Sequence, residues 1–110
     1  MPNAFRASRD VIIRTANFRE ATHFYETVFG LQVASRSETL IGFEAGPFRL
    51  YLESGPPHGP VFEFLVADLQ AAKDSLVSAG CTVLEEDPDV PRCYIRDPYG
   101  LVFNIGQRSA

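Results

Sequence analysis

Side chains able to bind a small polar molecule recur at alternate positions of four β-prone segments. Successive side chains of a strand point to opposite faces, and one set of alternate positions here is largely polar. This set offers guanidinium groups that hold an anion or a carbonyl group, a phenol and a carboxamide that form hydrogen bonds, and carboxylates. The candidate ligand-binding residues are Arg14, Arg49, Tyr51, Glu53, Asn104, Ile12 and Val102, with Leu65 as a further apolar wall.

Glu63 lies on the same face and is the candidate catalytic residue, because a positioned carboxylate can act as a general base. A simpler interpretation stays open for the whole set. Arginine and glutamate side chains pair with one another across a wet groove, since an unpaired charge on a concave face is costly. In that case the polar face binds nothing in particular.

The other alternate positions of the same segments are uniformly apolar, which suits packing under helices. They are Val11, Ile13, Leu50, Leu52, Phe62, Phe64, Val66, Phe103 and Ile105.

These segments belong to a pattern that occurs twice. In the first half, a strand at 11–16 leads to a helix at 18–29 with Asn17 as N-cap and Gly30 as its end, and three strands follow, at 31–34, 40–45 and 48–52. In the second half, a strand at 61–66, a helix at 69–79 capped by Asp68 and strands at 81–84, 92–96 and 101–105 keep that order, with a loop at 87–91. The sequence therefore predicts a single α+β domain, 1–110, of two tandem βαβββ modules (about 9–54 and 61–107) whose curved mixed sheet surrounds a crevice. The Gly- and Pro-rich segment 55–60 is the predicted linker.

Composition narrows the class of partner. The chain has 110 residues, 45% of them hydrophobic, and a formal net charge of -4. Without a basic cluster, neither nucleic acid nor an anionic membrane is expected as a partner, and a small molecule fits better. No apolar run reaches the length of a membrane span and the first residues do not resemble a signal peptide, so a cytoplasmic location is expected. Cys81 and Cys93 are expected to be reduced thiols in or near the core.

Three segments resemble the vicinal oxygen chelate superfamily, which includes glyoxalase I, the extradiol dioxygenases, the fosfomycin resistance enzymes and the bleomycin resistance proteins. They are IIRTANFREATHFYETVFGLQV (12–33), VADLQAAKDSLVSAGCTV (66–83) and DPYGLVFNI (97–105). The resemblance covers nearly the whole chain. It is specific for the fold rather than for one activity, because lyases, oxygenases, transferases and sequestering proteins share it.

The resemblance also implies up to four metal ligands, one from the first and one from the last strand of each module. The corresponding positions hold Asp10, Tyr51, Val61 and Asn104. Only Asp10 is an ordinary ligand of a divalent ion. We therefore expect no metal cofactor at these positions. An alternative site, in which His58 lies beside Glu53 or Glu63, stays open.

Three functions are compatible with this sequence. The first is a metal-free protein similar to the bleomycin resistance proteins, a homodimer that binds a small molecule in the crevice. The second is a lactoylglutathione lyase-like enzyme or a dioxygenase with a non-standard metal site. The third is a non-catalytic dimeric regulatory or partner protein.

Overall fold

The predicted repeat is confirmed: one strand, one helix and three strands occur twice along the chain, so the fold is α+β. The computed structural model describes residues 4–89 and 92–108. The elements are β1 (Arg6–Thr15), α1 (Phe18–Thr27), β2 (Gln32–Arg36), β3 (Leu40–Glu44) and β4 (Arg49–Ser54), then β5 (His58–Val66), α2 (Leu69–Ser78), β6 (Thr82–Asp87), β7 (Arg92–Arg96) and β8 (Val102–Gln107).

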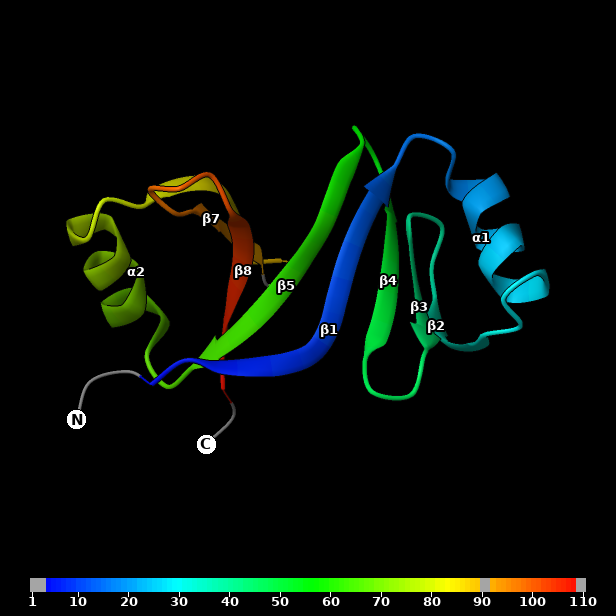
Figure 1. Cartoon of the computed structure of the whole chain (residues 1–110), viewed down its shortest axis with the longest axis horizontal. Coiled ribbons are helices and arrows are strands. Elements are labelled where there is room, and N and C mark those ends of the chain that lie inside the picture. The colour runs from blue at the N-terminus through cyan, green and yellow to red at the C-terminus, as the bar shows by residue number, and fades with distance from the viewer. Residues whose placement is uncertain (1–3, 90–91, 109–110) are drawn as a thin grey trace. The chain divides into compact units, whose positions relative to one another are not determined.

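Each copy of the repeat forms a four-stranded mixed sheet with the same internal order. In the first, the strands lie in the order β2-β3-β4-β1, and in the second in the order β6-β7-β8-β5. The first and last strands of each copy are parallel neighbours, whereas the other neighbours are antiparallel. Figure 1 shows both repeats, with α1 beside the first set of strands and α2 beside the second.

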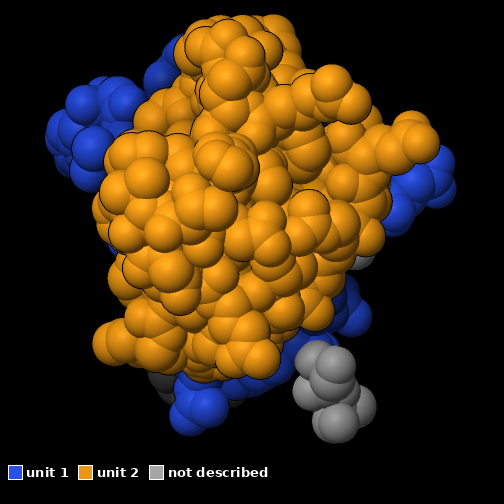
Figure 2. Space-filling model, turned by 90° about the vertical axis from the view of Figure 1, so that its right-hand side faces the viewer, with its two compact units in different colours: residues 1–8, 62–110 blue, residues 9–61 orange. Residues whose placement is uncertain are grey.

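The chain divides into two compact units. One is Arg9–Val61, here called the N-terminal module, and the other is Phe62–Ala110 with Met1–Ser8, here called the C-terminal module (Figure 2). In the described parts of the chain, no helix is long and apolar enough to cross a membrane.

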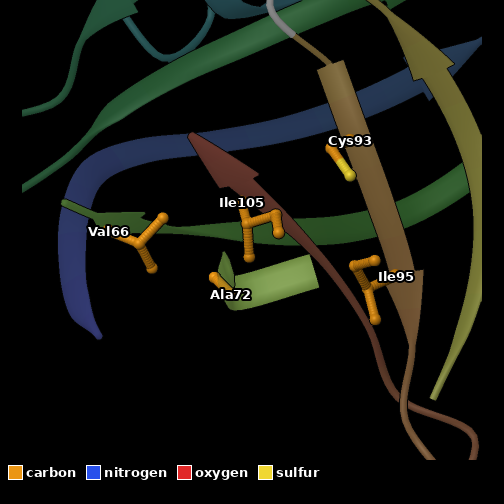
Figure 3. Packing of buried hydrophobic residues seen from close by; sticks show 5 residues of the cluster. All are labelled: Val66, Ala72, Cys93, Ile95 and Ile105. Atoms are coloured by element: carbon orange, nitrogen blue, oxygen red, sulfur yellow. The ribbon is translucent and has the colours of Figure 1, made fainter. Parts of the chain in front are cut away.

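Each module has its own hydrophobic core between its helix and its sheet. In the N-terminal module Ile41, Phe43, Leu50 and Leu52 are buried, and Phe18, Ala21 and Tyr25 of α1 pack against them. In the C-terminal module the buried cluster is Val66, Ala72, Cys93, Ile95 and Ile105, and Figure 3 shows these side chains converging from α2 and three strands. The apolar alternate positions therefore face the helices, as the sequence predicts.

Phe62 is an exception to this pattern, because 59% of its surface is exposed. Its predicted place under a helix is wrong. Alternation fixes the side of the sheet to which a side chain points, but not whether a helix covers that point. The buried cluster gathers around Val66 and Ile105, and Phe62 lies at the other end of the β5–β8 pairing.

Helix α1 is shorter than predicted and ends at Thr27 rather than at position 29. Val28 and Phe29, which follow the helix, are 69% and 58% exposed, and Phe24 within the helix is 44% exposed. The rings of Phe24 and Phe29 contact each other, with centroids 5.4 Å apart. The predicted helix is present, but only some of its apolar side chains, Phe18, Ala21 and Tyr25, lie against the core.

The chain enters β5 earlier than the sequence predicts. This strand begins at His58 and includes Pro60, so residues 58–60 of the predicted linker are extended. The φ angle of proline suits an extended strand, and the pairing of β5 with β8 begins only at Phe62. Strand β6 likewise continues to Asp87, into the predicted loop, and Pro91 of that loop lies outside the described residues.

The turn before β8 explains why the DPYG sequence precedes a strand. The side chain of Asp97 accepts hydrogen bonds from the backbone N–H groups of Tyr99, at 2.8 Å, and Leu101, at 3.0 Å. Gly100 adopts a φ of 98°, a left-handed conformation that a side chain disfavours. This local network starts β8 at Val102 and so fixes which face Asn104 occupies.

The two helix N-termini differ, although the sequence predicts a capping residue at both. Asp68 accepts a hydrogen bond from the backbone N–H of Ala71 at 3.0 Å, whereas the side chain of Asn17 makes no capping hydrogen bond. Asn17 occupies the predicted N-cap position of α1, but without the side-chain hydrogen bond that usually accompanies it. Its backbone N–H is held by the Thr15 hydroxyl at 3.0 Å, with φ and ψ outside the usual capping region.

This difference gives a matched pair of variants. Asp68→Ala should lower the free energy of unfolding by about 1 kcal/mol, because a first-turn N–H loses its acceptor. Asn17→Ala should change it by less than about 0.5 kcal/mol, since no side-chain bond is lost. Urea denaturation of both variants measures the difference. Equal destabilisation by the two substitutions would contradict this account.

Candidate functional site

The polar alternate positions of the N-terminal module lie together on the sheet face opposite α1, here called the helix-distal face. The parallel register of β1 and β4 pairs Asp10 with Arg49, Ile12 with Tyr51, and Arg14 with Glu53. Register partners on neighbouring strands point to the same side of a sheet. The intervening residues Leu50 and Leu52 belong to the core under α1.

Arg14 and Glu53 form an ion pair on this face. The Nε atom of Arg14 lies 3.2 Å from Oε1 of Glu53, and the two side chains are only 13% and 16% exposed. A guanidinium group retains further N–H donors when one is used. The pair therefore supplies a fixed positive group with a compensating charge beside it.

Arg49 and Tyr51 form a second polar pair. Nη1 of Arg49 donates to the Tyr51 hydroxyl at 3.3 Å, and the Nε of Arg49 is buried without a hydrogen-bond acceptor. The hydrogen bond to Tyr51 and the nearby carboxylates of Asp10 and Glu44 raise the pKa of Arg49 above its ordinary value. Arg49 thus remains a cation with one unmet donor.

In the C-terminal module, Asn104 and Glu63 are register partners on the sheet face opposite α2. Nδ2 of Asn104 donates to Oε2 of Glu63 at 2.8 Å, and Oδ1 of Asn104 accepts from the backbone N–H of Cys93 at 2.7 Å. Asn104 is only 3% exposed. Both ends of its carboxamide are therefore engaged, and its direct effect is to orient the carboxylate of Glu63.

The two modules carry different chemistry at equivalent places. Ile12 with Tyr51 corresponds in the repeat to Glu63 with Asn104, since each pair joins the first and last strands of a module. Ile12, Leu65 and Val102 are partly buried apolar side chains, consistent with the wall that the sequence predicts. The two modules therefore share the pairing of their first and last strands but differ in the polar side chains that these strands carry.

The four positions that the family resemblance assigns to metal ligands do not form a suitable donor set here. Val61 has no donor atom and is 1% exposed. Both ends of the Asn104 amide are used, and the Tyr51 hydroxyl accepts from Arg49. Asp10 alone offers a carboxylate. These residues do not fit a divalent ion, which needs several free O or N ligands.

His58 was the alternative ligand. Its Nδ1 atom lies 2.9 Å from the carbonyl oxygen of Gly59, the next residue in the chain. Of its two predicted companions, Glu53 is engaged by Arg14 through Oε1, and Glu63 accepts from Asn104 through Oε2. Within residues 4–89 and 92–108, no three His, Cys, Asp or Glu side chains form a group able to hold a metal.

Sequence reasoning missed two supporting residues. A Cβ atom at Gly42 would lie 2.7 Å from Cε1 of Tyr51 and 2.8 Å from the Ser35 hydroxyl, so glycine makes room for the tyrosine ring. The backbone of Cys93 provides the donor that holds Asn104. A glycine within a predicted strand was the available signal for the first, because it often marks a close approach, whereas a backbone donor leaves no mark in the sequence.

Neither cysteine forms a disulfide, and both are associated with the core of the C-terminal module. Burial raises the pKa of the Cys93 thiol and of the Cys81 thiol. Both thiols are therefore protonated at neutral pH, which is the state expected of structural rather than nucleophilic cysteines.

Comparisons with known proteins agree with this architecture. A family model described as a glyoxalase-like domain matches residues 10–106. A glyoxalase/bleomycin resistance protein/dioxygenase superfamily member from Vibrio splendidus 12B01 is similar over 96% of this chain and 100% of its own, with 14% identity and a TM-score of 0.70. The hypothetical protein BH1468 from Bacillus halodurans C-125 is similar over 97% and 96%, with 11% identity and a TM-score of 0.71.

A third similar structure is an anaerobic substrate complex of homoprotocatechuate 2,3-dioxygenase from Brevibacterium fuscum with 3,4-dihydroxyphenylacetate. It shares 18% identity over 98% of this chain, with a TM-score of 0.73, and this chain spans 38% of its length. At such identities the likeness concerns the fold alone. No curated protein matches the sequence.

Proposed function

Because the chain belongs to the glyoxalase-like domain family, we propose that it binds a small molecule carrying a carboxylate or carbonyl group on the helix-distal face of its N-terminal module. Arg49 and Arg14 hold the oxygen atoms of the ligand. Tyr51 orients Arg49, Glu53 orients Arg14, and Ile12 supplies apolar contact. The superfamily fold supports small-molecule binding as a class, and the residues on this face suggest the chemistry of the ligand.

The observation that carries this proposal is the state of Arg49. Its Nε is a buried donor without an acceptor, while Nη1 is held by Tyr51. A buried donor without a partner is rare in folded proteins, because it loses its bond to water and gains nothing in return. A ligand oxygen placed against Arg49 after a small movement of the side chain relieves that cost. The bond is charge-assisted and therefore stronger than one between neutral groups.

The proposed binding does not use a divalent metal at the family's positions. The engaged amide of Asn104 and the apolar Val61 support this part of the proposal. Recognition then depends on arginine donors, which are also suited to carboxylate groups. The metal-dependent lyase or dioxygenase, the dimeric partner protein and the homodimer itself remain predictions of the sequence.

Glu63, on the corresponding face of the C-terminal module, is kept as the candidate general base, and the ligand site proposed above does not include it. Asn104 donates to one oxygen of its carboxylate, which leaves the other oxygen available to accept a proton. A carboxylate fixed in this way is a suitable general base. In this proposal Asn104 is a positioning residue.

The test is a calorimetric titration with phenylacetate and 3,4-dihydroxyphenylacetate, with EDTA present. The second probe is chosen because a dioxygenase of similar fold was solved with it. Arg49→Met keeps most of the side-chain length but removes the guanidinium group, so the affinity should fall about 10- to 100-fold, the usual effect of losing a hydrogen bond to a charged group. Arg96→Met, at an exposed position of β7, is the matched control and should bind as the unmodified protein does.

Each outcome bears on the proposal. Binding in EDTA that is lost in Arg49→Met and kept in Arg96→Met supports it. Equal affinity of the two variants, or no binding of either probe, contradicts the assigned face. Binding that appears only after addition of a divalent metal contradicts the metal-free proposal and favours the metal-dependent alternative.

A further inference from the structure

A groove lies on the opposite side of the N-terminal module, beside α1. It has a volume of about 490 Å³, within the range of small-molecule sites. Phe18, Thr22 and Glu26 of α1 line one side together with their neighbours Arg19 and His23. These positions follow one another at helical spacing and therefore share a stripe of the helix surface. Figure 2 is a view of the module (orange) from the side on which α1 lies.

The opposite side of this groove consists of Arg36, at the end of β2, and Glu38, which follows it. Nη2 of Arg36 lies 3.1 Å from Oε2 and 3.3 Å from Oε1 of Glu26. This ion pair joins the two sides and neutralises both charges. The groove therefore has a defined boundary, and the remaining charges are those of Arg19 and Glu38.

A buried hydroxyl group in the groove has no partner. The Oγ1 atom of Thr22 is buried and makes no hydrogen bond. A threonine in a helix usually satisfies its hydroxyl on a carbonyl of the preceding turn. Thr27 of the same helix does so, because its Oγ1 donates to the His23 carbonyl oxygen at 2.7 Å. Thr22 lines the groove, and its hydroxyl, buried in this conformation, has an unmet donor and acceptor that a ligand group can satisfy after a rotation of the side chain.

The unpaired charges indicate the type of ligand. Arg19 and Glu38 line the same groove, yet they form no ion pair with each other or with another described residue. A ligand with a single charge satisfies only one of them. A ligand with a carboxylate and an ammonium group satisfies both, and the Phe18 ring adds apolar surface. We propose that this groove binds a small zwitterion of the amino-acid type, with its carboxylate at Arg19 and Thr22 and its ammonium group at Glu38.

This site is independent of the ligand proposed for the helix-distal face. Phe18 packs against the core on the α1 side of the sheet, whereas Arg49 and Tyr51 lie on the other side. Failure of one proposal therefore leaves the other intact. Variants of Thr22 report on the groove and variants of Arg49 on the helix-distal face.

The experiment is an NMR titration of the ¹⁵N-labelled full chain with L-phenylalanine. The comparison compounds are 3-phenylpropionate, which lacks the ammonium group, and 2-phenylethylamine, which lacks the carboxylate. L-Phenylalanine should give saturable shifts at the amides of Arg19 and Thr22, with a Kd on the order of 1 mM or below. Each comparison compound should bind at least about fivefold more weakly.

Two variants test the role of the hydroxyl. Thr22→Val keeps the shape of the side chain and should weaken binding at least about fivefold, while its melting temperature stays the same or rises because an unmet buried hydroxyl is removed. Thr27→Val removes a hydroxyl outside the groove and should leave the affinity unchanged. Unaltered affinity of Thr22→Val, tight binding of 3-phenylpropionate alone, or no saturable shift with L-phenylalanine each overturns the proposal.

Discussion

Phe43→Ala should lower the free energy of unfolding by about 3–5 kcal/mol, the usual result of removing a fully buried aromatic side chain. Phe43 has an exposed fraction of 0% and lies at the centre of the N-terminal core. Its ring centroid is 6.3 Å from that of Tyr25, so the substitution also removes a contact between β3 and α1. Since a domain of this size has only about 5–15 kcal/mol of net stability, a large part would be lost.

Phe48→Ala is the matched control, because the same atoms are removed from a side chain that is 40% exposed. It should cost about 1 kcal/mol or less. Urea denaturation followed by tyrosine fluorescence and by circular dichroism measures both variants. A cost for Phe43→Ala no greater than that for Phe48→Ala would mean that the core of this module is not centred on β3.

Asn104→Leu should destabilise the protein by about 2–3 kcal/mol, although it places an apolar residue of similar size at a buried position. The substitution leaves the backbone N–H of Cys93 without its acceptor and removes the donor to Glu63. A buried donor that loses its partner carries its full desolvation cost. Glu63→Gln is the control: the new amide oxygen still accepts from Asn104, so the cost should stay below about 1 kcal/mol.

Asn104→Asp should make the stability of the protein depend on pH. The new carboxyl group can still accept from Cys93, but it faces the Glu63 carboxylate where an amide now donates over 2.8 Å. Two carboxylates this close cannot both be ionised, so the pKa of the new group is raised in the folded state above its unfolded value of about 4. A raised pKa in the folded state means that stability is lost as the pH rises above the unfolded value.

The variant should therefore be less stable relative to the unmodified protein at about pH 8 than at about pH 5. Denaturation curves at the two pH values test this, and adding Glu63→Gln to Asn104→Asp should reduce the difference, leaving only the part that burial of the new carboxyl group causes. A pH-independent loss in the single variant would show that Glu63 and Asn104 do not interact in solution.

Much of the fold could be predicted because its signals are local. Gly30 and Gly80, which follow the two helices with positive φ, the Asp97 turn and the alternation of apolar residues each depend on a few neighbouring positions. Their recurrence in the same order was enough to predict two βαβββ modules. The candidate face followed from the same alternation, and the observed register places Arg14 beside Glu53 on that face.

The predictions from sequence that the structure did not bear out concern side chains whose environment is set by distant parts of the chain. Asn17 occupies the N-cap position, yet its φ and ψ lie outside the usual capping region and its side chain makes no capping hydrogen bond. Phe62 has the correct alternation but no helix above it. Neither outcome can be read from a few neighbouring residues, because both depend on how the other helices and strands pack.

The sequence by itself determined the order of the elements, the two faces of each sheet and the residue types available to bind a ligand, since backbone periodicity and side-chain chemistry are local properties. Only the tertiary structure decided which groups are engaged. Asn104 is held between Glu63 and the backbone of Cys93, whereas Arg49 and Thr22 keep unmet polar atoms. Hydrogen bonding depends on distances between groups far apart in the chain, and those distances exist only once the sheets and helices have packed.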